Sequence, residues 1–157
     1  MNGSLIIVSS ETGGKFLEGT ITDTSKPGTC MEIVPATTPI QGHHSYRACS
    51  RTAGLKGPIV VLLEDDLQGV VASGAYVAGT RGRLYMPLAG DDLNMLVGDI
   101  AGTSDTIAIG DGFGVLNTGK LHPDSSYASV PFQAQEAYTS ALLADTLVWV
   151  KYLGNQA

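Results

Sequence analysis

Charged side chains are scarce in this chain. Asp, Glu, Lys and Arg make up 15% of its 157 residues, whereas roughly a quarter is usual for a soluble domain. Neutral residues take their place, chiefly threonine, serine and 20 glycines. Because this mixture is typical of short strands joined by tight turns, and not of helix bundles, the composition predicts a mostly β domain.

Basic charge is scarcer still, and the chain has no block of consecutive lysines or arginines. The net charge is −6 and the sequence pI is about 4.8. Such a chain has little electrostatic drive toward a phosphate backbone, so we expect no nucleic-acid partner. The charge is also uneven, because residues 1–62 hold five basic and four acidic side chains while residues 63–157 hold four and eleven.

Long apolar runs and a cysteine framework are missing as well. No uninterrupted apolar run approaches the roughly 20 residues of a membrane span, and the run at residues 5–8 is too short for a signal peptide. We therefore expect a protein that is made and used in a cytoplasm-like compartment, with no membrane partner. Cys30 and Cys49 lack zinc-finger spacing, and we interpret both as small apolar packing residues.

The composition divides the chain into two parts. Residues 1–56 contain short apolar runs between glycines and prolines, and such isolated strands need partners for their backbone groups. We predict an extended N-terminal arm over residues 1–56 that depends on a neighbouring chain for order. A β-rich core domain is predicted over residues 57–157.

The core domain contains several apolar runs that are bounded by Gly or by acidic turns. They lie at residues 58–63, 74–79, 83–88, 93–97, 106–109 and 115–117. The first run is apolar throughout, which predicts a strand that is buried on both faces. The last two flank a turn at residues 110–112 and are expected to pair antiparallel. The spacing favours a β-meander or a small β-barrel.

The C-terminal part holds one ambiguous segment and one clear strand. Residues 131–145 fit helical spacing and strand alternation equally well, so both remain open. Residues 146–153 predict a strand that is apolar on both faces, with a central position or a subunit interface. Alternation places Leu147, Trp149 and Leu153 on one face, which we predict to be a subunit interface. The other face, with Val148, Val150 and Tyr152, would meet the subunit's own core.

Residues able to bind metal or phosphate occur without the spacing that such sites need. His43 and His44, together with Cys30 and Cys49, match no known zinc pattern, and adjacent residues of a strand point to opposite faces. The glycine-rich stretch at 110–114 lacks the ending of a phosphate loop, and is better explained as a tight turn.

Acidic residues are interpreted in the same way. Glu64, Asp65 and Asp66, with Asp91 and Asp92, offer oxygen ligands for calcium, but solvated turns explain them better because no EF-hand spacing is present. No nucleophile elbow or recognisable catalytic cysteine occurs. We therefore predict no catalytic residue, no cofactor and no metal.

Several segments resemble a known family. They lie at residues 19–28, 61–69, 75–90, 93–97, 109–112, 119–121 and 145–150. Their glycine-marked strands, and a final strand of the form Asp-x-Leu-x-x-Val, are similar to those of the small β-rich head decoration (cement) proteins of tailed bacteriophages. The resemblance covers most of the chain but not the surroundings of Gly13, Gly14, His43 and His44.

The resemblance implies a non-enzymatic structural protein of the virion, built on a compact β-barrel or β-tulip-like domain with an extended N-terminal arm. It implies a homotrimer that binds the major capsid protein on the outside of the assembled capsid, after synthesis in the host cytoplasm. Two alternatives remain open. One is a tail or baseplate adaptor protein, and the other is a trimeric all-β hydrolase such as a dUTPase, whose signature motifs do not occur in order.

Overall fold

The computed structural model describes residues 6–10, 13–34, 43–49, 58–65, 68–71, 73–98, 107–123, 131–138 and 146–154. These residues form eleven β-strands and no α-helix. Accordingly, no helix within these ranges could cross a membrane. The predicted mostly β fold with a small barrel is confirmed.

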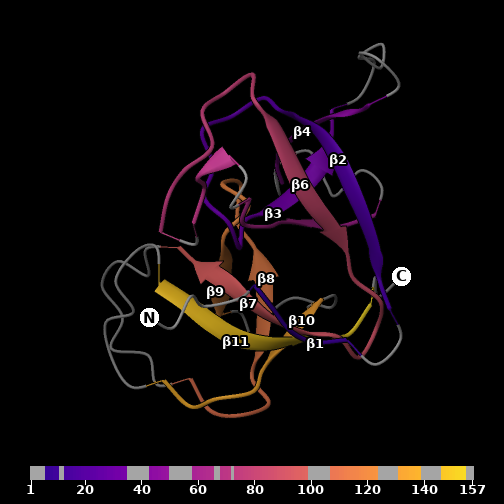
Figure 1. Ribbon diagram of the computed structural model, residues 1–157. Coiled ribbons are helices and arrows are strands. Elements are labelled where there is room, and N and C mark those ends of the chain that lie inside the picture. The colour runs from indigo at the N-terminus through magenta and orange to yellow at the C-terminus, as the bar shows by residue number, and fades with distance from the viewer. Residues whose placement is uncertain are drawn as a thin grey trace.

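Five strands close a first barrel, which is the upper part of the molecule in Figure 1. They are β2 (Lys15–Ile21), β3 (Cys30–Ile33), β4 (Ser45–Ala48), β5 (Val60–Leu62) and β6 (Arg81–Met86). Around the ring the order is β2-β4-β3-β5-β6. All neighbours are antiparallel except β2 and β4, which meet as a short parallel pair at Thr20 and Ile21.

The second half of the chain forms a second ring, the lower part of Figure 1. Its strands are β7 (Asp92–Val97), β8 (Gly112–Val115), β9 (Leu121–Pro123), β10 (Phe132–Ala134) and β11 (Thr146–Tyr152). They follow the order β7-β11-β10-β8-β9, and a parallel pairing of Val97 with Leu121 joins the two ends. An additional strand, β1 (Ile7–Ser9), lies outside the ring and pairs with β7.

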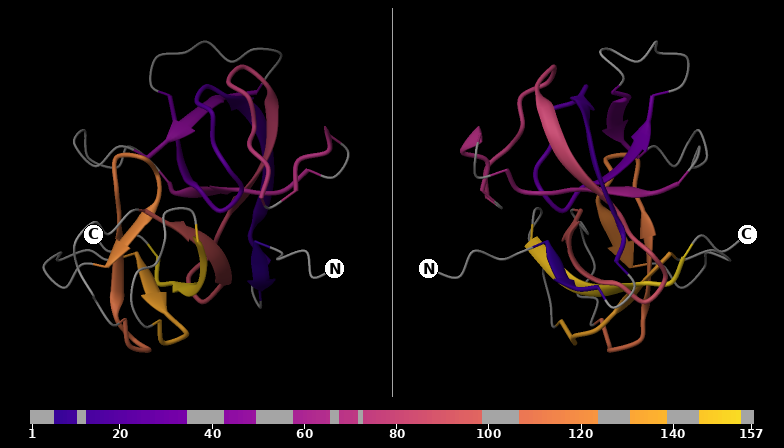
Figure 2. Two further views of the ribbon diagram at one scale, coloured as in Figure 1. Left: turned by 90° about the vertical axis from the view of Figure 1, so that its left-hand side faces the viewer. Right: turned by 45° about the vertical axis from the view of Figure 1, so that its right-hand side comes forward.

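The two rings have the same connectivity. In each, the first strand along the chain pairs parallel with the third and antiparallel with the fifth. The second strand pairs with the third and fourth, and the fourth with the fifth. Figure 2 shows the rings as two lobes, one above the other. The chain therefore builds one barrel design twice.

Strand β5 lies between the two barrels and is buried on both sides. Val60 and Leu62 belong to the apolar cluster inside the first barrel. Val61 and Leu63 belong to a larger cluster that extends into the second barrel. Each such side chain contributes about 1.5–3 kcal/mol when fully buried. The prediction of a doubly buried strand at residues 58–63 is confirmed.

Two glycines bring the barrels into backbone contact. Gly28 donates its N–H to the Leu62 carbonyl in the first barrel and accepts the Leu96 N–H from the second. Gly119, in the turn between β8 and β9, accepts the N–H of Cys30. Both have positive φ, 86° and 71°, which glycine adopts without the steric cost of a Cβ atom. These bonds join the two barrels through main-chain atoms.

The structure differs from the predicted division at residues 56 and 57. Three strands from residues 1–56 and two from residues 57–157 together close the first barrel, so β2, β3 and β4 of the proposed arm are barrel wall, while β1 pairs with β7. The glycines explain the difference, because a Cβ on Gly19 would lie 2.3 Å from the Tyr46 ring and one on Gly82 would lie 2.6 Å from Ile21. Glycine here makes room for large side chains inside a narrow barrel, and does not signal an extended arm.

Other expected elements differ in detail. Residues 74–79 form no strand, and Tyr76 alone bridges to Ser25. Ile107 bridges to Tyr138, whereas β8 pairs with β9 and β10, so the predicted pairing of 106–109 with 115–117 is wrong. Within the described part of the ambiguous segment, the strand alternative holds at Phe132–Ala134, and residues 139–145 lie outside the described ranges.

Candidate functional site

A notch opens in the wall of the first barrel where β2 and the segment before β4 diverge. The two strands pair only at Thr20 and Ile21, so residues 16–18 of β2 have no neighbour on that side among the described residues. The notch has a cavity volume of about 490 Å³. Its lining residues are Phe16, Leu17, Glu18, His43, His44, Tyr46 and Arg83.

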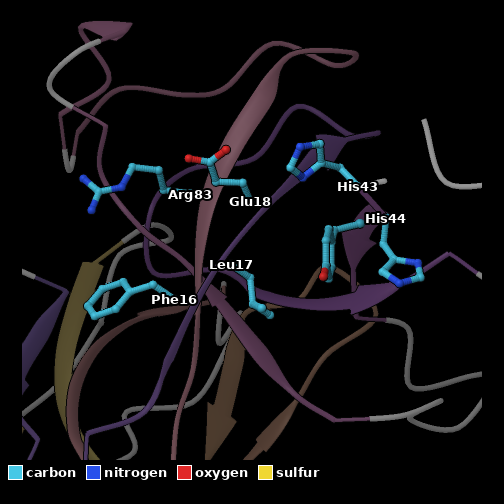
Figure 3. A pocket seen from close by; sticks show the side chains of 7 residues that line it. Phe16, Leu17, Glu18, His43, His44 and Arg83 are labelled. Atoms are coloured by element: carbon cyan, nitrogen blue, oxygen red, sulfur yellow. The ribbon is translucent and has the colours of Figure 1, made fainter. Parts of the chain in front are cut away.

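The floor of the notch is apolar. Leu17 and Tyr46 pack in the core cluster of the first barrel, and burial raises the pKa of Tyr46. Phe16 is 59% exposed and contacts Tyr85, with ring centroids 5.3 Å apart. In Figure 3, Leu17 lies between Phe16 on one side and His44 on the other. The notch thus offers aliphatic and aromatic surface to a ligand.

Charged groups line the upper rim in Figure 3. Glu18 forms a 2.8 Å ion pair with Arg81, whose guanidinium also contacts Nε2 of His43. Because arginine can only donate, His43 Nε2 accepts this hydrogen bond. Arg83 is the cross-strand neighbour of Glu18, and no ion pair joins it to a carboxylate in the described part of the chain. The rim therefore holds two guanidinium groups. That of Arg81 contacts Glu18 and His43, and that of Arg83 has no carboxylate partner among the described residues.

Only two of these residues, His43 and His44, stand out in the sequence, where they are considered as zinc ligands and that role is rejected. Phe16, Glu18 and Arg83 are not identified from the sequence. The available signal was the alternation of β2, in which Phe16, Glu18 and Thr20 share the outer face while Leu17 and Ile21 face inward.

The candidate metal ligands are separated in the structure. His43 and His44 line the notch, but Cys30 and Cys49 are fully buried in the cluster between the barrels, as expected for packing residues. Burial, followed by a hydrogen bond to Cys49, raises the pKa of the Cys30 thiol. Among the described residues, no three His, Cys, Asp or Glu side chains come together as a metal site would require.

Two of the acidic residues are not solvated, which corrects the sequence interpretation. Asp65 is 4% exposed and accepts a 2.7 Å hydrogen bond from Gln68. Asp91 is fully buried and accepts hydrogen bonds from the Tyr85 hydroxyl and the Leu88 N–H. Both carboxylates fix turns of the backbone. The turn at Gly110 is present, with a φ of 97°.

The C-terminal strand alternates in burial along β11. Val148, Val150 and Tyr152 are buried, while Leu147, Trp149 and Leu153 are partly exposed. β11 lies between β7 and β10, so its position in the sheet is central. Part of the Leu147 surface is used within the chain, because Leu147 packs against the core cluster and beside Gly28. The side chains that remain for a partner are mainly Trp149 and Leu153.

The fold is similar to that of a solved structure over most of the chain. The head fiber gp8.5 N base of bacteriophage phi29 aligns with a TM-score of 0.55 over 92% of this chain and 99% of that chain, at 10% sequence identity. No protein-family model matches the sequence, and no curated protein matches it. At this identity the similarity is one of fold. The resemblance to phage head proteins that the sequence motifs predicted is thus confirmed at the level of the fold.

Proposed function

We propose that this protein is a structural component of a tailed-phage head that binds the outside of the assembled capsid as a decoration protein. The observation that carries the proposal is the fold, which matches a phage head fiber base over nearly the full length of both chains. The head-protein motifs of the sequence support it independently. So does the form of the notch, which opens to solvent and whose described lining residues form no arrangement of nucleophile and base.

The proposal includes a homotrimer. Trp149 and Leu153 are partly exposed on one face of β11, and aromatic and aliphatic side chains of this kind anchor subunit interfaces. Three subunits would engage three equivalent capsid sites at once, which raises the effective concentration of each further contact. Modest individual interfaces then suffice for retention on the shell.

Quantitative mass spectrometry of purified virions tests the proposed function. We expect the protein in fixed stoichiometry to the major capsid protein, and we expect shells stripped of it to rebind the purified chain. Recovery of the protein only in detached tails would favour the adaptor alternative. Its absence from virions would overturn the proposal.

A further inference from the structure

The two barrels agree in individual hydrogen bonds as well as in connectivity. Before β3, Gly28 donates to the Leu62 carbonyl, and before β8, Gly110 donates to the Ala134 carbonyl. Each acceptor residue is the last of the fourth strand of its barrel. Both glycines have positive φ, 86° and 97°. The turn that enters the second strand is therefore the same structure in both barrels.

A tyrosine takes the same place in each barrel. Ser25 and Tyr76 exchange both backbone hydrogen bonds in the first barrel, and Ile107 and Tyr138 do so in the second. The Tyr138 hydroxyl accepts the Trp149 N–H. These correspondences fix the residue-by-residue equivalence of the barrels.

The equivalence extends to the first strands. Leu63 donates to the Arg83 carbonyl, and Gln135 donates to the Trp149 carbonyl, so Arg83 and Trp149 are equivalent. Their cross-strand partners are Glu18 on β2 and Asn94 on β7. Residues 16–18 of β2 therefore correspond to residues 92–94 of β7.

In the second barrel this edge is covered by an added strand. β1 pairs with β7, Ile7 lies opposite Leu93, and the Asn94 N–H donates to the Ile6 carbonyl. Ile6 is fully buried and Ile7 packs against the same cluster. An extended aliphatic segment outside the five-stranded ring thus completes the second barrel.

In the first barrel the equivalent edge is the open side of the notch. The N–H groups of Thr20 and Thr22 donate toward the β4 side, to His44 and Tyr46, while the Ile21 N–H donates toward β6. Because backbone groups alternate along a strand, the N–H of Glu18 points into the notch. No described residue accepts it.

We propose that the notch between β2 and residues 43–46 accepts an extended strand from a different protein, antiparallel to β2, in the way that β7 accepts β1. An incoming carbonyl would accept the Glu18 N–H, and an aliphatic side chain would pack on Leu17 and Tyr46. This mode of recognition uses main-chain hydrogen bonds for affinity and alternate side chains for specificity. Resting on the proposed function, the inference assigns the strand to the major capsid protein.

A second copy of the chain is the less suitable donor. Its β1 is already paired with its own β7, and each of its other described strands is paired within a barrel. The occupant that fits is an extended aliphatic segment, since the equivalent edge holds Ile6 and Ile7. The exposed Phe16 ring offers further apolar surface to a residue on the outer face.

A proline at position 18 tests the incoming hydrogen bond. Glu18→Pro removes the N–H that points into the notch as well as the carboxylate, and leaves the donors toward β6 in place. Glu18→Ala keeps the N–H and removes the carboxylate. In co-sedimentation with stripped shells, we expect Glu18→Ala to bind within about twofold of wild type and Glu18→Pro to bind about tenfold more weakly. A Glu18→Pro variant with wild-type circular dichroism and wild-type binding would overturn the inference.

Amide hydrogen exchange gives a second readout that needs no variant. The probes are stripped shells and a synthetic peptide of this chain's residues 6–10 flanked by lysines, at millimolar concentration. We expect exchange of the Glu18 amide to slow at least about tenfold with either probe, with the Ile21 amide as the already bonded reference. Unchanged Glu18 exchange with both probes would refute the strand site. If wild type fails to bind shells but the peptide protects Glu18, the proposed function fails and the strand site stands.

Discussion

The two barrels have the same pattern of strand pairing, but they differ in what covers the edge of the first strand. The second barrel covers the edge of β7 with β1, whereas the first leaves the equivalent edge of β2 open beside the notch. Their interiors also differ, because Met31 opposite Val60 in the first corresponds to Phe113 opposite Phe132 in the second. Connectivity is therefore preserved while side chains and edges vary, and the open edge is where the two barrels differ most in what they offer a partner.

The largest expected effect comes from separating the barrels at Gly119. A Cβ there would lie 2.3 Å from the Cys30 carbonyl oxygen and 2.7 Å from Thr29, and φ is +71°. We expect Gly119→Ala to lower the free energy of unfolding by about 3 kcal/mol or more, because backbone crowding adds to the strain of a positive φ. Urea denaturation of the variant and of wild type measures this difference in the free energy of unfolding.

Gly79→Ala is the matched control for this substitution. Its φ of +87° is similar, but nothing lies within 4 Å of the added Cβ. Only the conformational cost of about 1–2 kcal/mol is expected. Equal losses for the two variants would mean that the contact between the barrels adds nothing to stability.

The next effect concerns Trp149 and its equivalent in the other barrel, Arg83. If Trp149 anchors the proposed trimer, Trp149→Ala should weaken each contact by about 2 kcal/mol or more and separate the subunits at micromolar concentration. Arg83→Ala should leave the oligomer intact. Light scattering measures both. A wild-type monomer, or a Trp149→Ala subunit that unfolds instead of separating, would move Trp149 from the interface to the core.

Alkaline pH should destabilise the fold through the two equivalent tyrosines. Burial raises the pKa of Tyr76 and of Tyr138 to about 12 from a normal value of 10. A raised pKa in the folded state stabilises the fold fully below pH 10, and this stabilisation is lost as the pH rises through 12. Phenylalanine has no hydroxyl to ionise. Between pH 10 and 12, the free energy of unfolding of Tyr76→Phe should therefore fall less steeply than that of wild type, by roughly 1 kcal/mol per pH unit. The pKa of Tyr138 is raised to the same value, so Tyr138→Phe should change the slope by a similar amount.

The smallest expected effect is on the rim of the notch. Glu18 and Arg81 form an ion pair in which both side chains are about half exposed. Exposed pairs of this kind contribute roughly 0.2–1 kcal/mol, so Glu18→Ala should change the midpoint of urea unfolding little, and less still at high salt. A loss above about 2 kcal/mol would show that the rim supports the barrel and is not free for a partner.

Local patterns predicted much of the fold. The continuous apolar run around Val61 predicted a strand buried on both faces, and the alternation around Val150 predicted which side of β11 meets the core. These patterns depend on near neighbours in the sequence, and strand periodicity expresses them directly. The proposed interface face of β11, with Trp149, stays a prediction.

The first barrel could not be predicted, because its closure depends on distant pairs. β2 pairs with β6 along nearly its whole length, beginning with Lys15 opposite Met86. Nothing near Lys15 in the sequence indicates that partner. The repetition of the barrel was also hidden, because equivalent core residues such as Leu62 and Ala134 share only their burial. The notch could not be predicted either, because it exists only where β2 and residues 43–46 diverge in space.

Gly28 also determines how the molecule carries a mechanical load. The N–H of Gly28 donates to the Leu62 carbonyl in the first barrel, and the carbonyl of Gly28 accepts the Leu96 N–H from the second. A force that pulls the barrels apart must therefore rupture the bond from the Leu96 N–H to Gly28, together with the Cys30 bond to Gly119. We therefore expect these backbone bonds to hold the two rings together under tension, and unfolding by force to begin at the strands farthest from Gly28.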